Sequence, residues 1–345
     1  MAGSNKNKLT MLLGSFYILF GTMESMATNI PLPQLSSLSI ATSCSPSRGM
    51  LLWTTKSLLS NPAEQDQLIS LSLSSKITDI YAYLVKSDYS TFQEQLQTFN
   101  SKLNNAGIKI WGMEGYRGYF SDAYGPSELY AAANALSTFN SKVNSNSRFA
   151  GFYMNMQPQD GQGDEFKTTF HNDLCDSNLD PVSGGVWFDS ELKDREMLMR
   201  DWLLIAQSLR QKMNEAGLRL GAAMPSWTDD YYDEEILVSF NGIRQGLMKH
   251  MMQILNDYVV MSYNTNPRNA ANRLKGELAY ADTLPVSNRP RVFGGLETHP
   301  GSGMNVSYAD TAGKNNRTTV IQDIQTIQEI LGEHDSFCGI NLSDW

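Results

Sequence analysis

The stretch Arg148–Asp160, RFAGFYMNMQPQD, decides the fold. Its apolar run at 149–154 passes directly into a polar cluster that contains Asn155, Gln157 and Asp160. An apolar run followed by polar residues is typical of a buried strand that ends in a loop. In a barrel of parallel strands, functional side chains gather at the carboxyl ends of the strands. The stretch therefore predicts a functional strand end, if the rest of the chain supplies the other strands.

Short apolar runs recur along the chain and alternate with amphipathic segments. Including the first stretch at 149–157, the expected strands are 49–54, 77–85, 108–113, 149–157, 218–225, 258–263, 291–297 and 337–342. The expected helices are 62–75, 91–106, 127–143, 189–216, 236–255 with an interruption around Gly242, 270–284 and 318–331. Eight strands that alternate with helices predict a single (β/α)8 TIM barrel over 49–345.

An open, doubly wound sheet is the alternative that the same alternation leaves open. The glycine fingerprint of dinucleotide-binding sheets does not follow the first strand, and the chain has no P-loop motif. Nucleotide-binding versions of the open sheet are therefore disfavoured.

Composition describes a globular protein, with 41% hydrophobic and 18% charged residues over a length of 345. The formal net charge is −9 and the isoelectric point about 5.0. Because binding to phosphates requires clustered Lys and Arg, this balance argues against nucleic acid as a partner.

The N-terminus has the layout of a secretory signal peptide. Lys6 and Lys8 precede an apolar run at 9–23, and the small residues Ser25 and Ala27 follow it. We expect residues 1–27 to be the signal peptide and 28–48 to be an irregular segment. The mature protein would then be secreted or periplasmic, with no membrane attachment after cleavage; a buried N-terminal helix is the alternative.

Cysteine and histidine usage does not favour a metal site. Cys44, Cys175 and Cys338 are not spaced as zinc ligands, and none of the four histidines is paired at metal-ligand spacing. We expect no cofactor. One disulfide and a free thiol would suit an oxidising compartment, and the sequence leaves the pairing open.

The residues at or just after the predicted strand ends are aromatic, acidic or amide side chains. They are Trp53, Tyr83, Glu114, Asn155, Gln157, Trp227, Asp229, Tyr263, Glu297 and Asp344. Aromatic rings stack on the apolar faces of sugars, and carboxylates and amides bind sugar hydroxyls. This set predicts a carbohydrate site at a mouth that is also lined by Trp111, although barrel mouths carry mixed polar residues in any case.

Hydrolysis of a glycosidic bond normally requires two carboxyl groups, one on each side of the bond. Glu297, Glu114 and Asp160 are the candidate catalytic residues. Glu297 is the first choice because it ends a glycine-rich apolar strand. Glu114 and Glu297 end the third and seventh strands, which lie across an eight-stranded mouth, so the two carboxyl groups could be too far apart to act as a pair.

Five segments in order, GFYMNMQPQD, AMPSW, YVVMSYN, GGLET and GINLSDW, resemble a group of exported, poorly characterised TIM-barrel proteins related to glycoside hydrolases. The fourth-strand segment is also similar to the acidic signature of family 18 chitinases. The resemblance spans 49–345 and implies a glycan-processing barrel whose fourth strand carries the acid that protonates the leaving group.

The chain departs from that pattern at the positions that carry the chemistry. Asn155 and Gln157 stand where the resemblance implies Asp and Glu, and Asn264 and Ser343 stand where it implies Arg and His. An amide hydrogen-bonds but cannot serve as a general acid. Two hypotheses follow: a glycoside hydrolase that uses other carboxylates, or a catalytically inactive carbohydrate-binding or interaction protein on the same barrel.

Overall fold

The computed structural model describes Cys44 and residues 46–115, 126–156, 192–229 and 235–343. All of them belong to one compact unit. The predicted signal peptide and nearly all of the segment 28–48 lie outside the described residues, and the first strand begins at Ser47.

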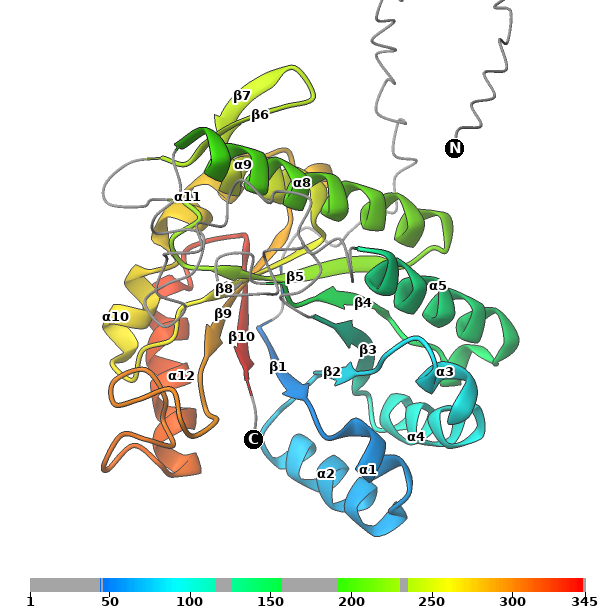
Figure 1. The fold of residues 1–345 in the computed structure, drawn as a ribbon. Helices are drawn as coiled ribbons and strands as arrows, with labels where there is room; N and C mark the ends of the chain where they lie inside the picture. The colour runs from blue at the N-terminus through cyan, green and yellow to red at the C-terminus, as the bar shows by residue number, and fades with distance from the viewer. Residues whose placement is uncertain (1–43, 45, 116–125, 157–191, 230–234, 344–345) are drawn as a thin grey trace, which may run out of the picture. The chain divides into compact units, whose positions relative to one another are not determined.

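Eight parallel strands close into a barrel, with helices around the outside (Figure 1). In order around the barrel they are β1 (Ser47–Leu52), β10 (Phe337–Leu342), β9 (Arg291–Leu296), β8 (Asp257–Met261), β5 (Arg219–Pro225), β4 (Gly151–Met154), β3 (Lys109–Glu114) and β2 (Asp79–Tyr83). The first strand pairs with both β2 and β10, so the sheet has no open edge. The predicted (β/α)8 barrel is confirmed, and the open sheet is excluded.

The described α-helices on the outside are α1 (Thr55–Leu59), α2 (Pro62–Ser74), α3 (Asp88–Thr91), α4 (Gln93–Asn105), α5 (Ser127–Lys142), α8 (Leu192–Glu215), α9 (Leu247–Ile254), α10 (Pro267–Asn272), α11 (Lys275–Thr283) and α12 (Arg317–Leu331). None of the helices in the described ranges is long and apolar enough to cross a membrane.

The helix boundaries follow from local chemistry. Asn61, Asn266 and Asn316 cap α2, α10 and α12, where each side chain accepts hydrogen bonds from backbone N–H groups of the first turn. Gly107 and Gly217 follow the ends of α4 and α8 with positive φ of 78° and 66°, which glycine adopts without strain.

The expected helix at 236–255 is wrong in its first half. A β-hairpin occupies it, formed by β6 (Leu237–Phe240) and β7 (Ile243–Gly246), and only α9 is helical. Asn241 and Gly242 both have positive φ, as a two-residue hairpin turn requires. The side chain of Glu196 on α8 accepts from Ser239 N and from Arg244, which fixes the hairpin to the helix.

Alternation along the strands separates two apolar layers. Alternate strand residues point into the barrel and form a cluster of Leu51, Tyr81, Trp111, Met113, Tyr153, Ala223, Val259, Met261, Phe293 and Cys338. The intervening residues, such as Ile80, Ala82 and Ile110, pack outward against the helices. This alternation determines which strand-end side chains face the mouth.

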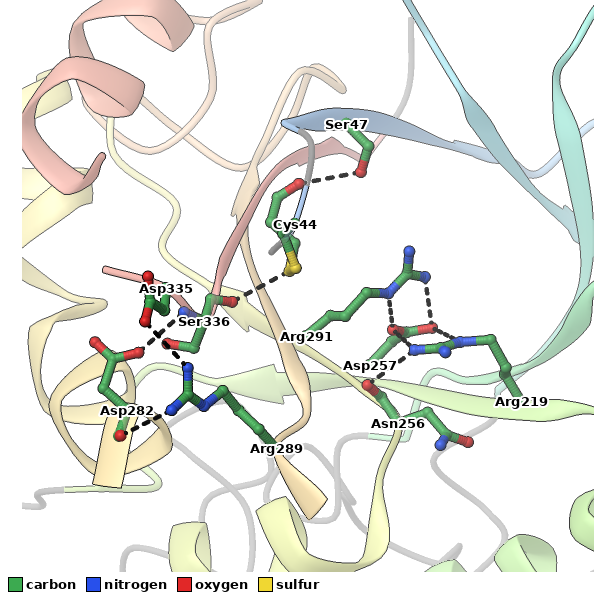
Figure 2. Close-up of a disulfide and its surroundings, with 11 residues drawn as sticks. Cys44, Ser47, Arg219, Asn256, Asp257, Asp282, Arg289, Arg291, Asp335 and Ser336 are labelled. Carbon is green, nitrogen blue, oxygen red and sulfur yellow. Dashed lines mark hydrogen bonds and ion pairs between the residues drawn. A yellow bond between two sulfur atoms is a disulfide. The ribbon is translucent and has the colours of Figure 1, made fainter. Parts of the chain in front are cut away.

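The amino end of the barrel holds a buried ion cluster (Figure 2). Asp257 begins β8 with its side chain fully buried, and Arg219 and Arg291 from the two neighbouring strands donate to both of its carboxylate oxygens at 2.6–3.2 Å. Burial alone would raise the pKa of Asp257, but the two guanidinium groups more than offset this effect and lower it. These two ion pairs therefore link β5, β8 and β9 at their amino ends.

A disulfide joins Cys44, just before β1, to Cys338 in β10, with 4.9 Å between the two Cα atoms (Figure 2). It spans the seam at which the first and last strands pair. Ser47 Oγ donates to the Cys338 carbonyl oxygen at the same seam. The expected single disulfide is therefore Cys44–Cys338; Cys175 lies outside the described residues.

Candidate functional site at the barrel mouth

Glu297 immediately follows β9 and keeps the inward phase of that strand, two residues after Gly295 and four after Phe293. Its side chain is 9% exposed. His299 N donates to Glu297 Oε1 at 2.8 Å, and Ser343 Oγ donates to the same oxygen. The carboxylate is thus held at the mouth by two donors, in a fixed position.

Ser343 connects this carboxylate to an aromatic pair. The backbone carbonyl oxygen of Ser343 accepts from Trp53 Nε1 at 3.1 Å. The Trp53 ring lies 5.6 Å from the Tyr83 ring, centroid to centroid, and Trp53 is 40% exposed. A large aromatic ring is therefore held open to solvent within reach of the same serine that holds Glu297.

Tyr263 completes this group. It packs against the inward-facing cluster. Burial raises the pKa of Tyr263, and the negative charge of Glu297 raises it further, so the phenol stays protonated and available as a donor. The structure thus brings together Glu297, Trp53, Tyr83 and Tyr263 of the predicted set.

A small pocket, open to solvent, lies beside this group, and its interior of about 10 Å³ has room for about one water-sized group. Its walls are mostly apolar and include Leu51, Ala223, Val259, Met261 and Leu342. Four of its lining residues carry side-chain hydrogen-bonding groups: Tyr153, Tyr263, Asn341 and Ser343. The pocket can therefore admit one small polar group, such as a hydroxyl or a water.

Glu114 has the opposite orientation from Glu297. It follows Met113, which points inward, and so shares the outward phase of Gly112, which presses against Tyr89 of α3 and Leu136 of α5. Glu114 is 3% exposed. Burial raises the pKa of Tyr89, and the negative charge of Glu114 raises it further. The two glutamates therefore point to different sides of the barrel wall.

Asn155 keeps the inward phase of β4, two residues after Tyr153, and is partly exposed at the mouth. The Asn155 carbonyl oxygen lies so close to Gly115 that a Cβ at position 115 would collide with it. Gln157, Asp160 and Asp344 lie outside the described residues, so their predicted roles stay predictions.

Three other predicted residues lie away from this group. Trp227 is partly buried against the outer, helix-facing cluster. The Asp229 carboxylate lies close to Gly276 at the start of α11. Its charge adds to the effect of burial in raising the pKa of Glu277. The prediction that Trp111 lines the mouth is wrong: it is fully buried, and its Nε1 donates at 2.9 Å to Asp79, which begins β2.

Asn341 lines the pocket but was not among the predicted site residues. It lies inside β10, whereas the predicted site residues stand at or just after strand ends. The signal that could have found it is a polar residue within the apolar run FCGINL, two positions before Ser343 and therefore in the same phase.

Within the described ranges, no group of three or more His, Cys, Asp or Glu side chains could hold a metal ion. The polar groups of the pocket are neutral hydroxyl and amide groups, with one carboxylate adjoining. Such an arrangement can hydrogen-bond a hydroxylated ligand and stack it on an aromatic ring.

No protein-family model and no curated protein sequence matches this chain. Solved structures similar to it include a chitinase from Chromobacterium violaceum, with 11% identity, a TM-score of 0.46, and coverage of 87% of this chain and 94% of that one. A class V chitinase mutant from Cycas revoluta in complex with (GlcNAc)3 has 10% identity, a TM-score of 0.47, and coverage of 86% and 94%.

The spore cortex-lytic enzyme SleL from Bacillus megaterium is a third, with 10% identity, a TM-score of 0.46, and coverage of 88% of this chain and 72% of that one. All three of these solved structures have TM-scores below 0.5 against this chain. At such low identity they do not assign a family or an activity to this chain.

Proposed function

We propose that this chain is an exported protein that binds a glycan at the carboxyl-terminal mouth of its barrel. The observation that carries the proposal is the connected group at the mouth: the exposed Trp53 ring and the Glu297 carboxylate share Ser343 as a hydrogen-bond partner. An aromatic face beside a fixed carboxylate suits a sugar, which offers C–H groups on one face and hydroxyl donors at its edges.

Binding without turnover is the form of this function that the described residues favour. Two-carboxylate hydrolysis requires carboxyl groups about 5 to 9.5 Å apart across one cleft. Glu114 faces the helix side of the wall, and Asn155 is an amide at the position where the resemblance implies an acid. Hydrolysis is the second candidate, because Glu297 is a buried carboxylate at the mouth. It would need a second carboxylate, for which Asp160 is the predicted residue.

Export is part of the proposal. The Cys44–Cys338 disulfide supports it, because structural disulfides persist in oxidising compartments and are rare in reducing ones. The basic and apolar pattern of residues 1–27 supports it as well.

The test combines binding and turnover on one purified protein. Isothermal titration with a panel of soluble oligosaccharides should detect binding that Trp53→Ala weakens at least tenfold. Leu73→Ala is the control, because it removes another exposed apolar side chain, on α2 and away from the mouth. A reducing-end assay of the same mixtures should show no products.

Reducing ends that form with the wild type and disappear with Glu297→Gln would establish the second candidate instead. If no saccharide in the panel binds, or if Trp53→Ala binds as tightly as the wild type, the mouth is not a glycan site.

A further inference from the structure

Three segments of the chain fit the acceptor signal for N-linked glycosylation, Asn-x-Ser/Thr with any residue except proline at x. They begin at Asn305, Asn316 and Asn341. In this modification the side-chain amide nitrogen of the asparagine receives a glycan. Because the glycan is large and polar, it must project into water once the protein has folded. The exposure and the contacts of the three side chains therefore decide which position can carry one.

Asn341 lies where a glycan does not fit. It is 2% exposed within β10, and its Nδ2 lies 3.3 Å from Tyr81 Oη. Its direct neighbour across the β1–β10 pair is Gly49, where an added Cβ would collide with Asn341 Oδ1. Because the space beside this amide does not admit even one more carbon atom, the folded barrel excludes a glycan at this position.

Asn316 is exposed, but its side chain is already engaged. Its Oδ1 caps α12, where it accepts from Thr319 N at 2.9 Å and from Thr319 Oγ1 at 3.0 Å. Its Nδ2, the atom that would carry the glycan, donates to the Gly313 carbonyl oxygen at 3.5 Å. This nitrogen is thus turned toward the chain, and a glycan on it would disturb the helix cap.

Asn305 has neither obstacle. It is exposed, with a φ of 65°, a value that asparagine adopts more readily than most residues. Its hydrogen bonds to described residues come from its backbone: its N–H donates to Thr311 Oγ1 and its carbonyl oxygen accepts from Thr265 N, each at 3.0 Å. These bonds fix the backbone and leave the side-chain amide unengaged among the described residues.

The turn around Asn305 is held from within its own loop and faces water. The Asp310 carboxylate accepts from Gly301 N and Gly303 N at 2.8–3.1 Å. Met304, directly before the asparagine, is 71% exposed. A glycan attached here would therefore extend into solvent without displacing any packed group.

We propose that Asn305 carries an N-linked glycan in the exported protein. Its amide nitrogen attacks the anomeric carbon of an oligosaccharide that is bound to a lipid pyrophosphate. The C–N bond forms, the C–O bond to the pyrophosphate breaks, the lipid pyrophosphate leaves with the bonding electrons, and the amide releases one proton. A transferase of the exporting cell catalyses this step.

Transfer has to precede folding, because the Ser307 hydroxyl of the acceptor signal is buried in the fold and donates to the His299 carbonyl oxygen. The fold then determines which modified chains reach the native state. This inference rests on the export that is part of the proposed function, and it does not depend on what the barrel mouth binds.

The test is a peptide map of the protein that its own organism exports. A glycan-releasing amidase in water enriched in heavy oxygen converts each glycosylated asparagine to a labelled aspartate. The label should appear at position 305 and be absent from position 341. Asn305→Gln, produced in the same cells, should lose the mass of one glycan, whereas Asn315→Gln, an exposed asparagine outside the three signals, should keep the glycan.

An exported protein without label at Asn305 overturns the inference and leaves the export standing. Label at Asn341 in the folded protein also overturns it, because the fold would then not select the acceptor. If Asn305→Gln is not secreted, the label on the wild type still decides the matter. If the wild type is not exported at all, the export fails and the inference fails with it.

Discussion

Ser343 lies where the last strand meets the mouth. Its backbone N–H donates to the Leu296 carbonyl oxygen, and it makes three further hydrogen bonds. Its hydroxyl donates to Glu297 and accepts from Thr298 N at 3.0 Å, while its backbone carbonyl accepts from the Trp53 indole. A single residue thus fixes both the carboxylate and the aromatic ring. Because these side chains are already ordered, ligand binding costs less of their conformational entropy.

The substitution Ser343→Ala tests this role. It removes the hydroxyl and leaves the backbone bond to Trp53, so Glu297 loses one of its two described donors. We expect the affinity for the best oligosaccharide to fall about fivefold, which corresponds to the roughly 1 kcal/mol of one hydrogen bond. Titration of Ser137→Ala, a partly buried serine on α5, is the matched control. Equal affinities for the two variants would contradict the role of Ser343.

At the residue scale, sequence reasoning succeeds where the strand phase is clear. Glu297 follows a glycine-rich run, and the structure places its side chain inward as a mouth residue must be. Glu114 also stands at a strand end, but it directly follows the inward-facing Met113 and therefore faces the helices. A strand-end position therefore has to be combined with alternation to tell which side of the wall a residue faces.

Among the elements, α11 carries an unusual group in its first turn. Glu277 is fully buried, and both of its carboxyl oxygens lack hydrogen-bond partners among the described residues. Burial raises the pKa of Glu277 well above its usual range, and the nearby charge of Asp229 raises it further. The carboxyl group is therefore protonated in the folded state at pH values where the unfolded chain has released the proton.

The consequence is a stability that declines with pH. Because the folded pKa is raised, stability linked to Glu277 is fully present below the unfolded value of about 4.3 and is lost as the pH rises toward the folded pKa. We expect Glu277→Gln, which cannot ionise, to raise the free energy of unfolding more at pH 8 than at pH 4. Urea melts at both pH values measure this difference.

Glu94→Gln, on the exposed first turn of α4, is the matched control in the same melts. A stabilisation by Glu277→Gln that is equal at pH 4 and pH 8 would show that Glu277 is not the titrating group.

The disulfide links the two ends of the chain where the barrel closes. Its two cysteines are 294 residues apart in sequence, and they lie at the seam between β1 and β10. Cross-linking so long a loop lowers the conformational entropy of the unfolded chain, which stabilises the fold by about 6 kcal/mol in the chain-entropy model. We expect the double variant Cys44→Ala, Cys338→Ala to melt several degrees below the oxidised wild type.

Melting the wild type with and without a reductant provides the comparison, and the reductant should not change the melting of the double variant. The same melting temperature for the oxidised wild type and the double variant would refute a stabilising role.

Element positions were largely predictable because apolar runs and amphipathic spacing reflect burial directly. The error at 236–255 has a specific cause. The run LVSFNGIRQG contains Asn241-Gly242, the dipeptide that two-residue hairpin turns favour, and the helical periodicity of the following α9 concealed it. Local turn chemistry outweighed periodicity at this point.

For the whole molecule, the buried ion cluster at the amino end sets the tolerance to acid. The pKa of Asp257 is lowered in the fold, so its stabilising contribution is present above the unfolded value of about 3.9 and is lost as the pH falls through the folded value. We expect Asp257→Asn to cost about 3 kcal/mol near neutral pH, because two partly buried guanidinium groups lose their counter-ion.

This cost should shrink as the pH falls below about 4, because the unfolded wild-type chain then binds a proton at Asp257 that the folded protein does not bind until its lower pKa is reached. Denaturant unfolding across pH 2 to 7 measures it. A cost that is independent of pH would indicate a packing defect rather than a lost ion cluster.

The architecture of the whole chain was the most predictable level. Eight strands that alternate with helices are typical of a (β/α)8 barrel, so the order of the elements was enough to predict the fold. The pairing of Cys44 with Cys338 was not predictable, because it depends on which strands meet at closure. The signal peptide and the export that it implies remain predictions.

We propose that the mouth around Glu297 and Trp53 is a glycan site, and a crystal structure of the protein with its tightest-binding oligosaccharide tests this most directly. We expect a sugar ring against Trp53, with one of its hydroxyl groups hydrogen-bonded to Glu297. A saccharide bound elsewhere on the molecule, with the mouth empty at saturating concentration, would contradict it.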